Sequence, residues 1–176
     1  MQNYYPLQGE FDISVISSKR PISDKIRLPL TKLWSPADLP NFPYKYPILN
    51  RLFGDAQKLY GLEKELIGVD IAHVAETYFG YTHQAVMAKR RGVVKKVIST
   101  VWETIPHNNE GLKERKKYKK YSRTNIDHFI AVTDKAKVAL MKEGVKESKI
   151  SVIPMGVDLT KFKPSSKYKN KRDVNI

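Results

Sequence analysis

The order of short apolar segments along the second half of the chain constrains its fold most strongly. Between residues 69 and 153, segments rich in β-branched residues alternate with longer segments whose apolar residues have helical spacing. The predicted strands are 69–75, 96–102, 128–132 and 150–153, and the predicted helices are 81–91, 112–125 and 134–143. Strands that alternate with helices in this way form parallel sheets with right-handed crossovers. We therefore expect an α/β fold with a Rossmann-like, doubly wound and mainly parallel sheet.

The first 68 residues carry weaker signals. Two short extended segments are predicted there, at 11–17 and 25–30. Four prolines at positions 36–47 predict a loop without regular structure. Residues 48–66 have helical spacing, with an expected break near Gly61. These elements precede the alternating region and are expected to add strands to it.

Length and composition limit the classes of protein open to this chain. Its 176 residues, 41% of them hydrophobic, are enough for one domain with a core. We expect residues 1–163 to form that domain and residues 164–176, rich in Ser, Lys and Asn, to begin a linker. The absence of Cys excludes a disulfide scaffold and a Cys nucleophile. The net charge of +14 favours anionic partners, and neither a membrane-spanning segment nor a signal peptide is evident.

Candidate site residues follow from the rule that open parallel sheets bind ligands outside the carboxyl ends of their strands. Glu76 and Tyr78 come after one predicted strand, Trp102 and Glu103 end or follow the next, and Thr133 follows a third. The two carboxylates could hold sugar hydroxyls, and one of them could act as a base. The commoner role of such carboxylates is to cap the helices that follow, and they could also be simply solvated. Trp102 could stack on a sugar ring or belong to the core.

Several familiar sites are missing from the sequence. It contains neither the glycine-rich dinucleotide or P-loop motifs nor the G-x-S-x-G nucleophile motif. The four histidines do not have the spacing of metal ligands. We expect no metal site and no cofactor bound by this domain.

A basic segment at residues 113–123, KERKKYKKYSR, is the strongest charge feature. On a helix it would form a cationic face for an anionic membrane or a phosphate-bearing acceptor. It could also bind nucleic acid, which is the least favoured partner, or be a solvated helix surface. The residues expected to contact a membrane or phosphate are Lys116, Lys117, Lys119, Lys120 and Arg123.

The segment at residues 127–164 resembles the end of the N-terminal domain of group 1 (family 4) glycosyltransferases, which have the GT-B fold. Residues 130–133, Ile-Ala-Val-Thr, match the family's "iiavS", and residues 153–158, Ile-Pro-Met-Gly-Val-Asp, match "IPnGVD". Phe162 and Pro164 match the "F-x-P" that follows. The segments GVDIAHVAE and VISTVWET are similar to two earlier family strands, so the likeness covers about residues 69–164.

This resemblance implies the acceptor-binding half of a hexosyltransferase-type enzyme that moves a sugar from a nucleotide-sugar to a lipid-linked or polysaccharide acceptor. Trp102 stands where many members have His, and some members have Trp-Glu, so Glu103 is the expected catalytic residue. Glu76, Tyr78 and Thr133 are expected on the acceptor side together with Trp102.

The family's nucleotide-sugar site lies in a C-terminal domain that these residues do not match, so we expect no transfer by this chain alone. The family's first β-α unit is also unclear here. The resemblance implies a cytoplasmic location, with peripheral contact at the inner face of the membrane. The alternative is a non-catalytic basic α/β domain that binds anionic membrane, glycan or nucleic acid.

Overall fold

A computed structural model describes residues 2–21, 23, 25–157, 159 and 162. The predicted linker at 164–176 lies outside the described residues, as do Asp158 and Pro164 of the family motif. The strands are β1 Val15–Ser18, β2 Leu30–Leu33, β3 Ile71–Ala75, β4 Lys96–Val101, β5 His128–Ala131 and β6 Ile150–Val152. The α-helices are α1 Lys45–Phe53, α2 Leu62–Glu65, α3 Gly80–Arg90, α4 Lys113–Asn125 and α5 Asp134–Lys142. The 3₁₀ helices are η1 Gln2–Gly9, η2 Pro36–Asp38 and η3 Glu147–Lys149.

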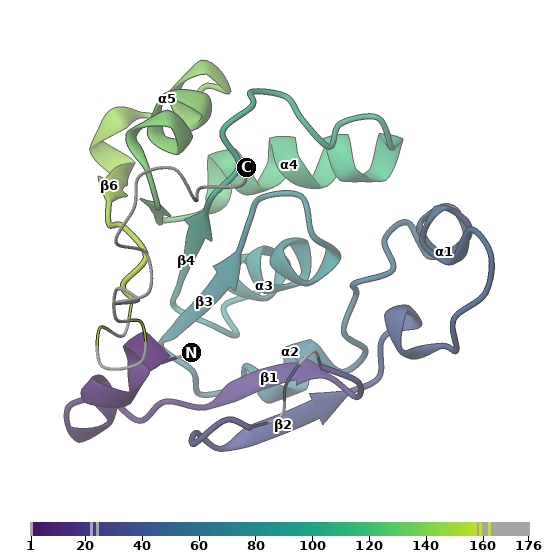
Figure 1. Cartoon of the computed structure of the whole chain (residues 1–176), viewed down its shortest axis with the longest axis horizontal. Helices are drawn as coiled ribbons and strands as arrows, with labels where there is room; N and C mark the ends of the chain where they lie inside the picture. Colours follow the sequence, from purple (N-terminus) through teal and green to yellow (C-terminus); the bar gives the residue numbers. More distant parts are fainter. Residues whose placement is uncertain (1, 22, 24, 158, 160–161, 163–176) are drawn as a thin grey trace, which may run out of the picture.

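The strands form two parallel sheets (Figure 1). The larger sheet has the order β3-β4-β5-β6, and every neighbouring pair in it is parallel. Strands β1 and β2 form a separate parallel pair in which Val15 lies opposite Leu30. The predicted α/β fold with parallel strands is therefore confirmed, although the strands belong to two sheets. Because consecutive strands are neighbours in the larger sheet, its strand order does not reverse within the described residues.

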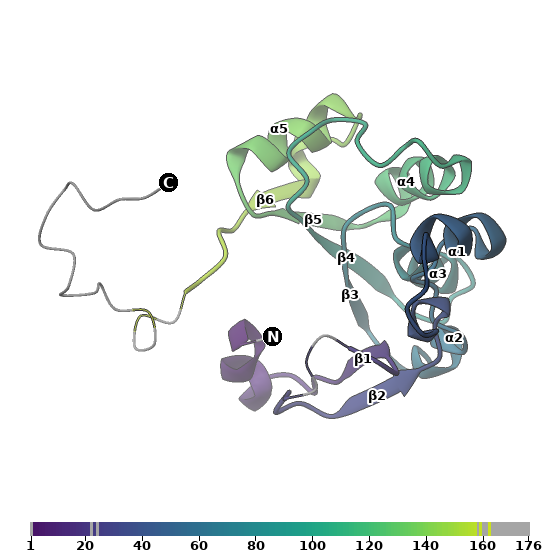
Figure 2. The ribbon, with the colours of Figure 1, turned by 45° about the vertical axis from the view of Figure 1, so that its right-hand side comes forward.

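One face of the larger sheet carries the core. Val97, Val101 and Phe129 are buried on this face, because side chains alternate between the two faces of a strand. Helices α3, α4 and α5 lie on one side of this sheet (Figure 2). Their apolar residues, among them Val86 of α3 and Leu140 of α5, belong to the same buried cluster. The alternating residues of β4 and β5 on the other face are only half-buried. The core is thus built between the sheet and the helices on one side.

The half-buried face of the sheet is contacted by η1. The hydroxyl of Tyr4 lies 2.6 Å from Nδ1 of His73, and Nε2 of His73 lies 2.8 Å from the hydroxyl of Thr100. Burial lowers the pKa of His73 below its ordinary value. His73 therefore has a packed and hydrogen-bonded position in β3.

The N-terminal third departs from the sequence predictions in detail. Residues 48–66 do not form one helix broken near Gly61, because α1 already ends at Gly54, which has a φ of 74°, and α2 is a single short turn. The predicted irregular loop contains η2, where Ser35 and Asp38 form a reciprocal capping box. Strand β2 begins only at Leu30, because its register is set by pairing with β1. These differences arise from tertiary pairing, which local sequence patterns do not report.

The helices of the larger sheet begin and end close to the predicted positions. Thr133 is the N-cap of α5, and its side-chain oxygen accepts a hydrogen bond from the backbone N–H of Ala136. Gly92 and Gly144 follow α3 and α5 with φ values of 76° and 91°, a conformation that glycine adopts without a steric cost. In the part of the chain that the structure describes, no helix combines the length and apolar character needed to cross a membrane.

Candidate active site

The carboxyl ends of β3 and β4 meet at Glu76, the residue directly after β3. Its side chain is buried, with the residue 1% exposed, and its Oε1 accepts hydrogen bonds from the backbone N–H groups of Trp102 and Glu103 at 2.9 and 3.1 Å. The backbone of Glu76 has a φ of 58°, which is uncommon for a residue with a side chain. Glu76 therefore fixes the path of the chain where it leaves β4.

Burial of Glu76 raises the pKa of its carboxyl group, and the two backbone N–H groups oppose this shift. Glu103 adds to the raised pKa through like-charge repulsion, and Lys119 lowers it. Oε2 of Glu76 is buried and makes no hydrogen bond with the protein. If Glu76 is protonated on Oε2, its Oε1 still accepts both backbone N–H groups, and the new O–H group can donate a hydrogen bond.

Glu103 lies at the start of the loop between β4 and α4, and it is partly exposed. Its Oε1 accepts a hydrogen bond from the backbone N–H of Ile105 at 2.9 Å. Its Oε2 accepts hydrogen bonds from the side-chain amides of Asn108 and Asn109, at 2.6 and 3.2 Å. These donors hold the carboxylate in one orientation, and its partial exposure leaves it accessible to a ligand.

Two aromatic residues flank this pair of glutamates. The side chain of Trp102 points outward enough that the residue is 50% exposed, so it is not part of the core. The ring of Tyr78 lies 5.5 Å from the guanidinium carbon of Arg115. Burial, followed by the nearby charges of Glu76 and Glu103, raises the pKa of Tyr78 to about 12. The structure thus brings together four of the predicted site residues: Glu76, Tyr78, Trp102 and Glu103.

Asp55 and Arg115 belong to the same region, and sequence reasoning did not identify them. Asp55 is completely buried, and its Oδ2 accepts a hydrogen bond from the backbone N–H of Gly80 at the first turn of α3. Its Oδ1 lies 3.3 Å from a guanidinium nitrogen of Arg115. Phe79, the N-cap of α3, has no capping side chain. The lack of a capping residue at position 79 was the one sequence signal that a distant acceptor is needed here. It could not show that this acceptor is Asp55, which lies 25 residues before Gly80.

The other predicted site residues are Thr133 and the basic residues of α4, and they differ from one another in their exposure to solvent. The exposed Thr133 caps α5, and contact with an acceptor stays a prediction. Lys116, Lys117 and Lys120 are exposed on α4, so their predicted contact with a membrane or phosphate also stays a prediction. The remaining two basic residues of the predicted face do not point freely into solvent.

Lys119 is turned inward, and the prediction that it contacts an external anion is wrong. Its side chain is 2% exposed, and its Nζ lies 2.5 Å from Oε1 of Glu143 and donates to the carbonyl of Asn108 at 2.8 Å. Arg123 is mostly buried and lies 3.2 Å from Oε2 of Glu143 and 3.3 Å from Oε1 of Glu110. Because Glu143 is buried at the end of α5, both cations compensate its charge.

His107, Glu110 and Glu143 bring possible metal-ligand atoms within 4.8 Å of one another. Arg123 already lies against both carboxylates, and Lys119 pairs with Glu143. The backbone N–H of His107 also donates to Glu143 at 2.7 Å. These contacts satisfy the carboxylates with protein donors, so the group serves to hold the 105–110 loop against α4 and α5.

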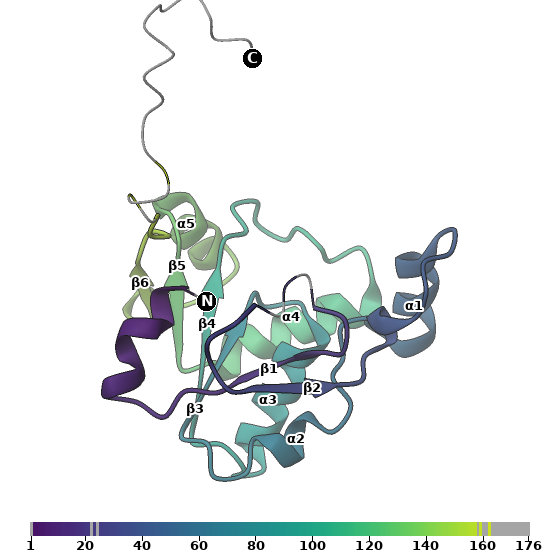
Figure 3. The ribbon, with the colours of Figure 1, turned by 60° about the horizontal axis from the view of Figure 1, so that its bottom comes forward.

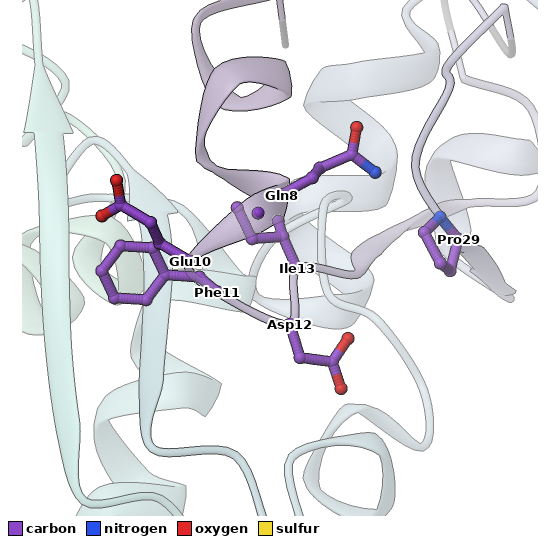
Figure 4. Close-up of a pocket in the computed structure, with 7 residues that line it drawn as sticks. Gln8, Glu10, Phe11, Asp12, Ile13 and Pro29 are labelled. Atoms are coloured by element: carbon purple, nitrogen blue, oxygen red, sulfur yellow. The ribbon is translucent and has the colours of Figure 1, made fainter.

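A hollow lies just before the N-terminal end of β1, and residues 8–13 together with Pro29 line it (Figure 4). It contains the backbone turn that follows η1, where the N–H of Phe11 donates to the carbonyl of Leu7 at 2.9 Å. None of its lining residues belongs to the group at the ends of β3 and β4. A smaller pocket at those strand ends is lined by Glu76, Glu103, Lys119 and Glu143, among others.

The partly exposed carboxylate and the exposed tryptophan thus lie at the carboxyl ends of parallel strands, the edge of the sheet at which open α/β domains bind ligands. A family model described as Glycosyltransferase Family 4 matches residues 8–161. The chain therefore belongs to Glycosyltransferase Family 4, and the expected Rossmann-like half of a GT-B enzyme is confirmed. A comparison with curated proteins gives no match.

Proposed function

We propose that this chain is the acceptor-binding half of a glycosyltransferase that moves a hexose from a nucleotide-sugar to a lipid-linked or polysaccharide acceptor. The observation that carries the proposal is the partly exposed Glu103 carboxylate at the carboxyl end of β4, held there through Glu76, Asn108 and Asn109. An acceptor hydroxyl is the group that such a carboxylate would bind.

In this proposal Glu103 is the catalytic residue. It accepts a hydrogen bond from the reacting hydroxyl of the acceptor and orients that hydroxyl towards the donor sugar. Orientation of two reacting groups removes a large part of the entropic barrier to their reaction. The carboxylate can also take the proton that the hydroxyl loses when the new glycosidic bond forms.

Trp102, Tyr78 and Thr133 bind the rest of the acceptor in this proposal. The half-exposed indole of Trp102 has the amphipathic surface on which a sugar ring can stack. The hydroxyl of Tyr78 stays protonated at neutral pH because its pKa is about 12, so it can donate a hydrogen bond. Thr133 offers an exposed position at the end of the neighbouring strand. Glu76 acts on the acceptor through Glu103.

The donor half lies, in this proposal, outside residues 1–163. Departure of the nucleotide requires charged or hydrogen-bonding groups that stabilise its developing negative charge. Because the family resemblance assigns those groups to a C-terminal domain, we expect no transfer by residues 1–176 alone. Robust turnover of a nucleotide-sugar by this chain without further sequence would contradict that part of the proposal.

The catalytic assignment is tested in a protein that includes any sequence encoded downstream. We expect Glu103→Gln to lower transfer about 100-fold or more, because the amide cannot accept the proton. Glu65→Gln, on the exposed surface of α2, is the matched control and should leave transfer unchanged. Equal transfer by Glu103→Gln and the unmodified protein would overturn the assignment. Retained acceptor binding without transfer from any nucleotide-sugar would favour the non-catalytic alternative.

A further inference from the structure

The loop between β4 and α4 carries Glu103 and holds its carboxylate. Figures 1 and 3 show this loop leaving the end of β4, passing beside α5 and turning back to the start of α4. The side-chain amides of Asn108 and Asn109 donate to Oε2 of Glu103. The backbone N–H of Ile105 donates to its Oε1. The orientation of the Glu103 carboxylate therefore depends on the path of the loop.

Two residues of this loop have a backbone conformation that is uncommon for residues with a side chain. His107 and Asn109 both have a φ of 61°, in the left-handed region. Asparagine tolerates this region better than most residues, so His107 is the more costly of the two. Such conformations persist only where contacts with the surroundings hold them. The loop therefore needs an anchor elsewhere in the fold.

The anchor is Glu143, the C-cap of α5. Its Oε1 accepts a hydrogen bond from the backbone N–H of His107 at 2.7 Å and lies 2.5 Å from Nζ of Lys119. The same Nζ donates to the carbonyl of Asn108 at 2.8 Å. One carboxylate thus holds two consecutive residues of the loop, residue 107 directly and residue 108 through a lysine of α4.

The pair formed by Lys119 and Glu143 is itself fixed. The two side chains are 2% and 3% exposed, and they come from different helices. The backbone N–H of Glu143 donates to the carbonyls of Ala139 and Leu140 in the last turn of α5. Separation of the two side chains would leave buried charge without its partner, which is costly. The pair can therefore hold the loop in one position.

We propose that Lys119 and Glu143 are positioning residues for sugar transfer. They hold the loop so that the amides of Asn108 and Asn109 direct the Glu103 carboxylate at the acceptor hydroxyl. Neither residue of the pair touches the acceptor, because both are buried. This inference rests on the proposed function, in which Glu103 is the catalytic residue.

Glu103 is thus supported in two separate ways. Glu76, directly after β3, accepts a hydrogen bond from its backbone N–H at 3.1 Å. The pair from α4 and α5 acts instead on its side chain, through Asn108. A pocket at the strand ends is lined by Glu76 and Glu103 together with Lys119 and Glu143. Loss of the pair should change the direction in which the Glu103 carboxylate points and leave the backbone at residue 103 in place.

The test variant is Lys119→Met combined with Glu143→Met. It removes both charges at once, so neither is left buried alone, and circular dichroism should show an intact fold. The matched control is Lys89→Met combined with Asp127→Asn, because Nζ of Lys89 lies 2.6 Å from Oδ1 of Asp127. That pair joins α3 to the residue before β5, at the opposite end of the sheet from Glu103.

Amide hydrogen exchange tests the anchor on residues 1–176 without any assay of activity. We expect the N–H of His107 to exchange about tenfold faster or more in the test variant, because it loses a charged acceptor. The control variant should leave this exchange rate unchanged. An unchanged rate in the test variant would show that Glu143 does not hold the loop, and it would overturn the inference.

Transfer is measured in a protein that includes any downstream sequence. We expect kcat of the test variant to fall about 10- to 100-fold, because a misplaced reacting group lowers the rate. The KM for the acceptor should change by less than about twofold, because the groups that bind the acceptor remain. An equal loss of kcat in the control variant, or a loss that appears only in KM, would overturn the positioning role.

Asn108→Ala is a second variant that leaves the buried pair intact. It removes the closer amide from Glu103 but keeps the carbonyl that Lys119 contacts. Because residue 108 is exposed, stability should be unchanged, whereas kcat should fall about tenfold. Unchanged kcat in this variant would show that the loop does not act through the amide of Asn108.

Failure of this inference can be distinguished from failure of the proposed function. If Glu103→Gln transfers as well as the unmodified protein, the catalytic assignment fails, and the positioning role fails with it. If Glu103→Gln is inactive while the Lys119 and Glu143 variant transfers normally, the assignment stands and the positioning role alone is overturned.

Discussion

The carboxylate of Glu76 accepts a hydrogen bond from the backbone N–H of Trp102 at 2.9 Å, and the next N–H along the chain donates to the same oxygen. One buried side chain directly after β3 thereby sets the direction in which the chain leaves β4. The partly exposed Glu103 depends on this bond for its position, although the two carboxylate groups do not share a hydrogen bond in the structure.

Removal of the Glu76 carboxylate is expected to destabilise the fold. In Glu76→Ala, the two N–H groups lose their acceptor and a cavity remains, so we expect a loss of about 2–4 kcal/mol in the free energy of unfolding. Glu76→Gln keeps an oxygen acceptor and should lose less. Urea denaturation of both variants measures the difference, and equal losses would contradict the role of that oxygen.

The raised pKa of Glu76 predicts a pH dependence of stability. A carboxyl group that is more basic in the folded state favours folding below its unfolded pKa, which lies near 4.5, and that contribution is lost as pH rises through the folded pKa. Glu76→Gln cannot titrate. The free energy of unfolding of the unmodified chain, relative to this variant, should therefore fall as pH increases from 4.5 upward. A constant difference across this range would show that the pKa is not raised.

His83 has the opposite pH dependence. Its ring stacks on Tyr118 with centroids 4.4 Å apart, and burial, followed by Lys117 and Lys58, lowers its pKa to about 4. The unfolded chain takes up the proton near pH 6.5, so His83 destabilises the fold as pH falls from 6.5 towards 4. Proton NMR can follow the titration of this imidazole, assigned by its loss in His83→Gln. A midpoint near 6.5 would contradict the prediction.

Lys119 and Lys120 are adjacent lysines with very different surroundings, and they form a matched pair. Lys119→Ala leaves the buried Glu143 with Arg123 as its remaining cation, so we expect a loss of about 3–5 kcal/mol. Lys120→Ala, on the exposed side of α4, should change the free energy of unfolding by no more than about 0.5 kcal/mol. Thermal or urea denaturation measures both. Similar values for the two variants would show that Lys119 is not buried in solution.

Trp102 and Trp34 also form a matched pair. Trp102 is half-exposed, so Trp102→Ala should cost about 1 kcal/mol or less in stability but weaken acceptor binding several-fold. Trp34 packs against Phe53 and Tyr60, with ring centroids 6.3 and 4.8 Å away. Because Trp34 is partly buried against these rings, Trp34→Ala should cost more, about 2 kcal/mol. Denaturation and titration with an oligosaccharide acceptor separate the two effects, and unchanged binding in Trp102→Ala would remove Trp102 from the site.

The strands and helices of the larger sheet could be predicted from the sequence because their periodicity is local. Helix α5 begins at Asp134, the predicted position, and β4 and β5 lie within a residue of their predicted ends. The N-terminal third was predicted less well. The position of β2, for example, depends on its pairing with β1, and no pattern within residues 25–33 contains that information.

The candidate site could be predicted only as far as the strand ends determine it. The rule for parallel sheets correctly brought Glu76 and Glu103 to one place, but it could not show that Glu76 faces the main chain of the neighbouring loop. The basic segment gave the right helix but treated its cations as equivalent. The inward position of Lys119 depends on a buried glutamate at the far end of another helix, which the sequence of α4 does not contain.

Glu76 accepts its hydrogen bonds from main-chain N–H groups, so these bonds do not depend on which side chains follow β4. Any residue except proline at positions 102 and 103 supplies the same two N–H groups. In the proposed acceptor site, the side chain at position 102 can therefore be exchanged, by selection or by an engineer, while the main chain beneath it keeps its path. Redesign of acceptor preference should begin at position 102 and leave the buried Glu76 and the proposed catalytic Glu103 untouched.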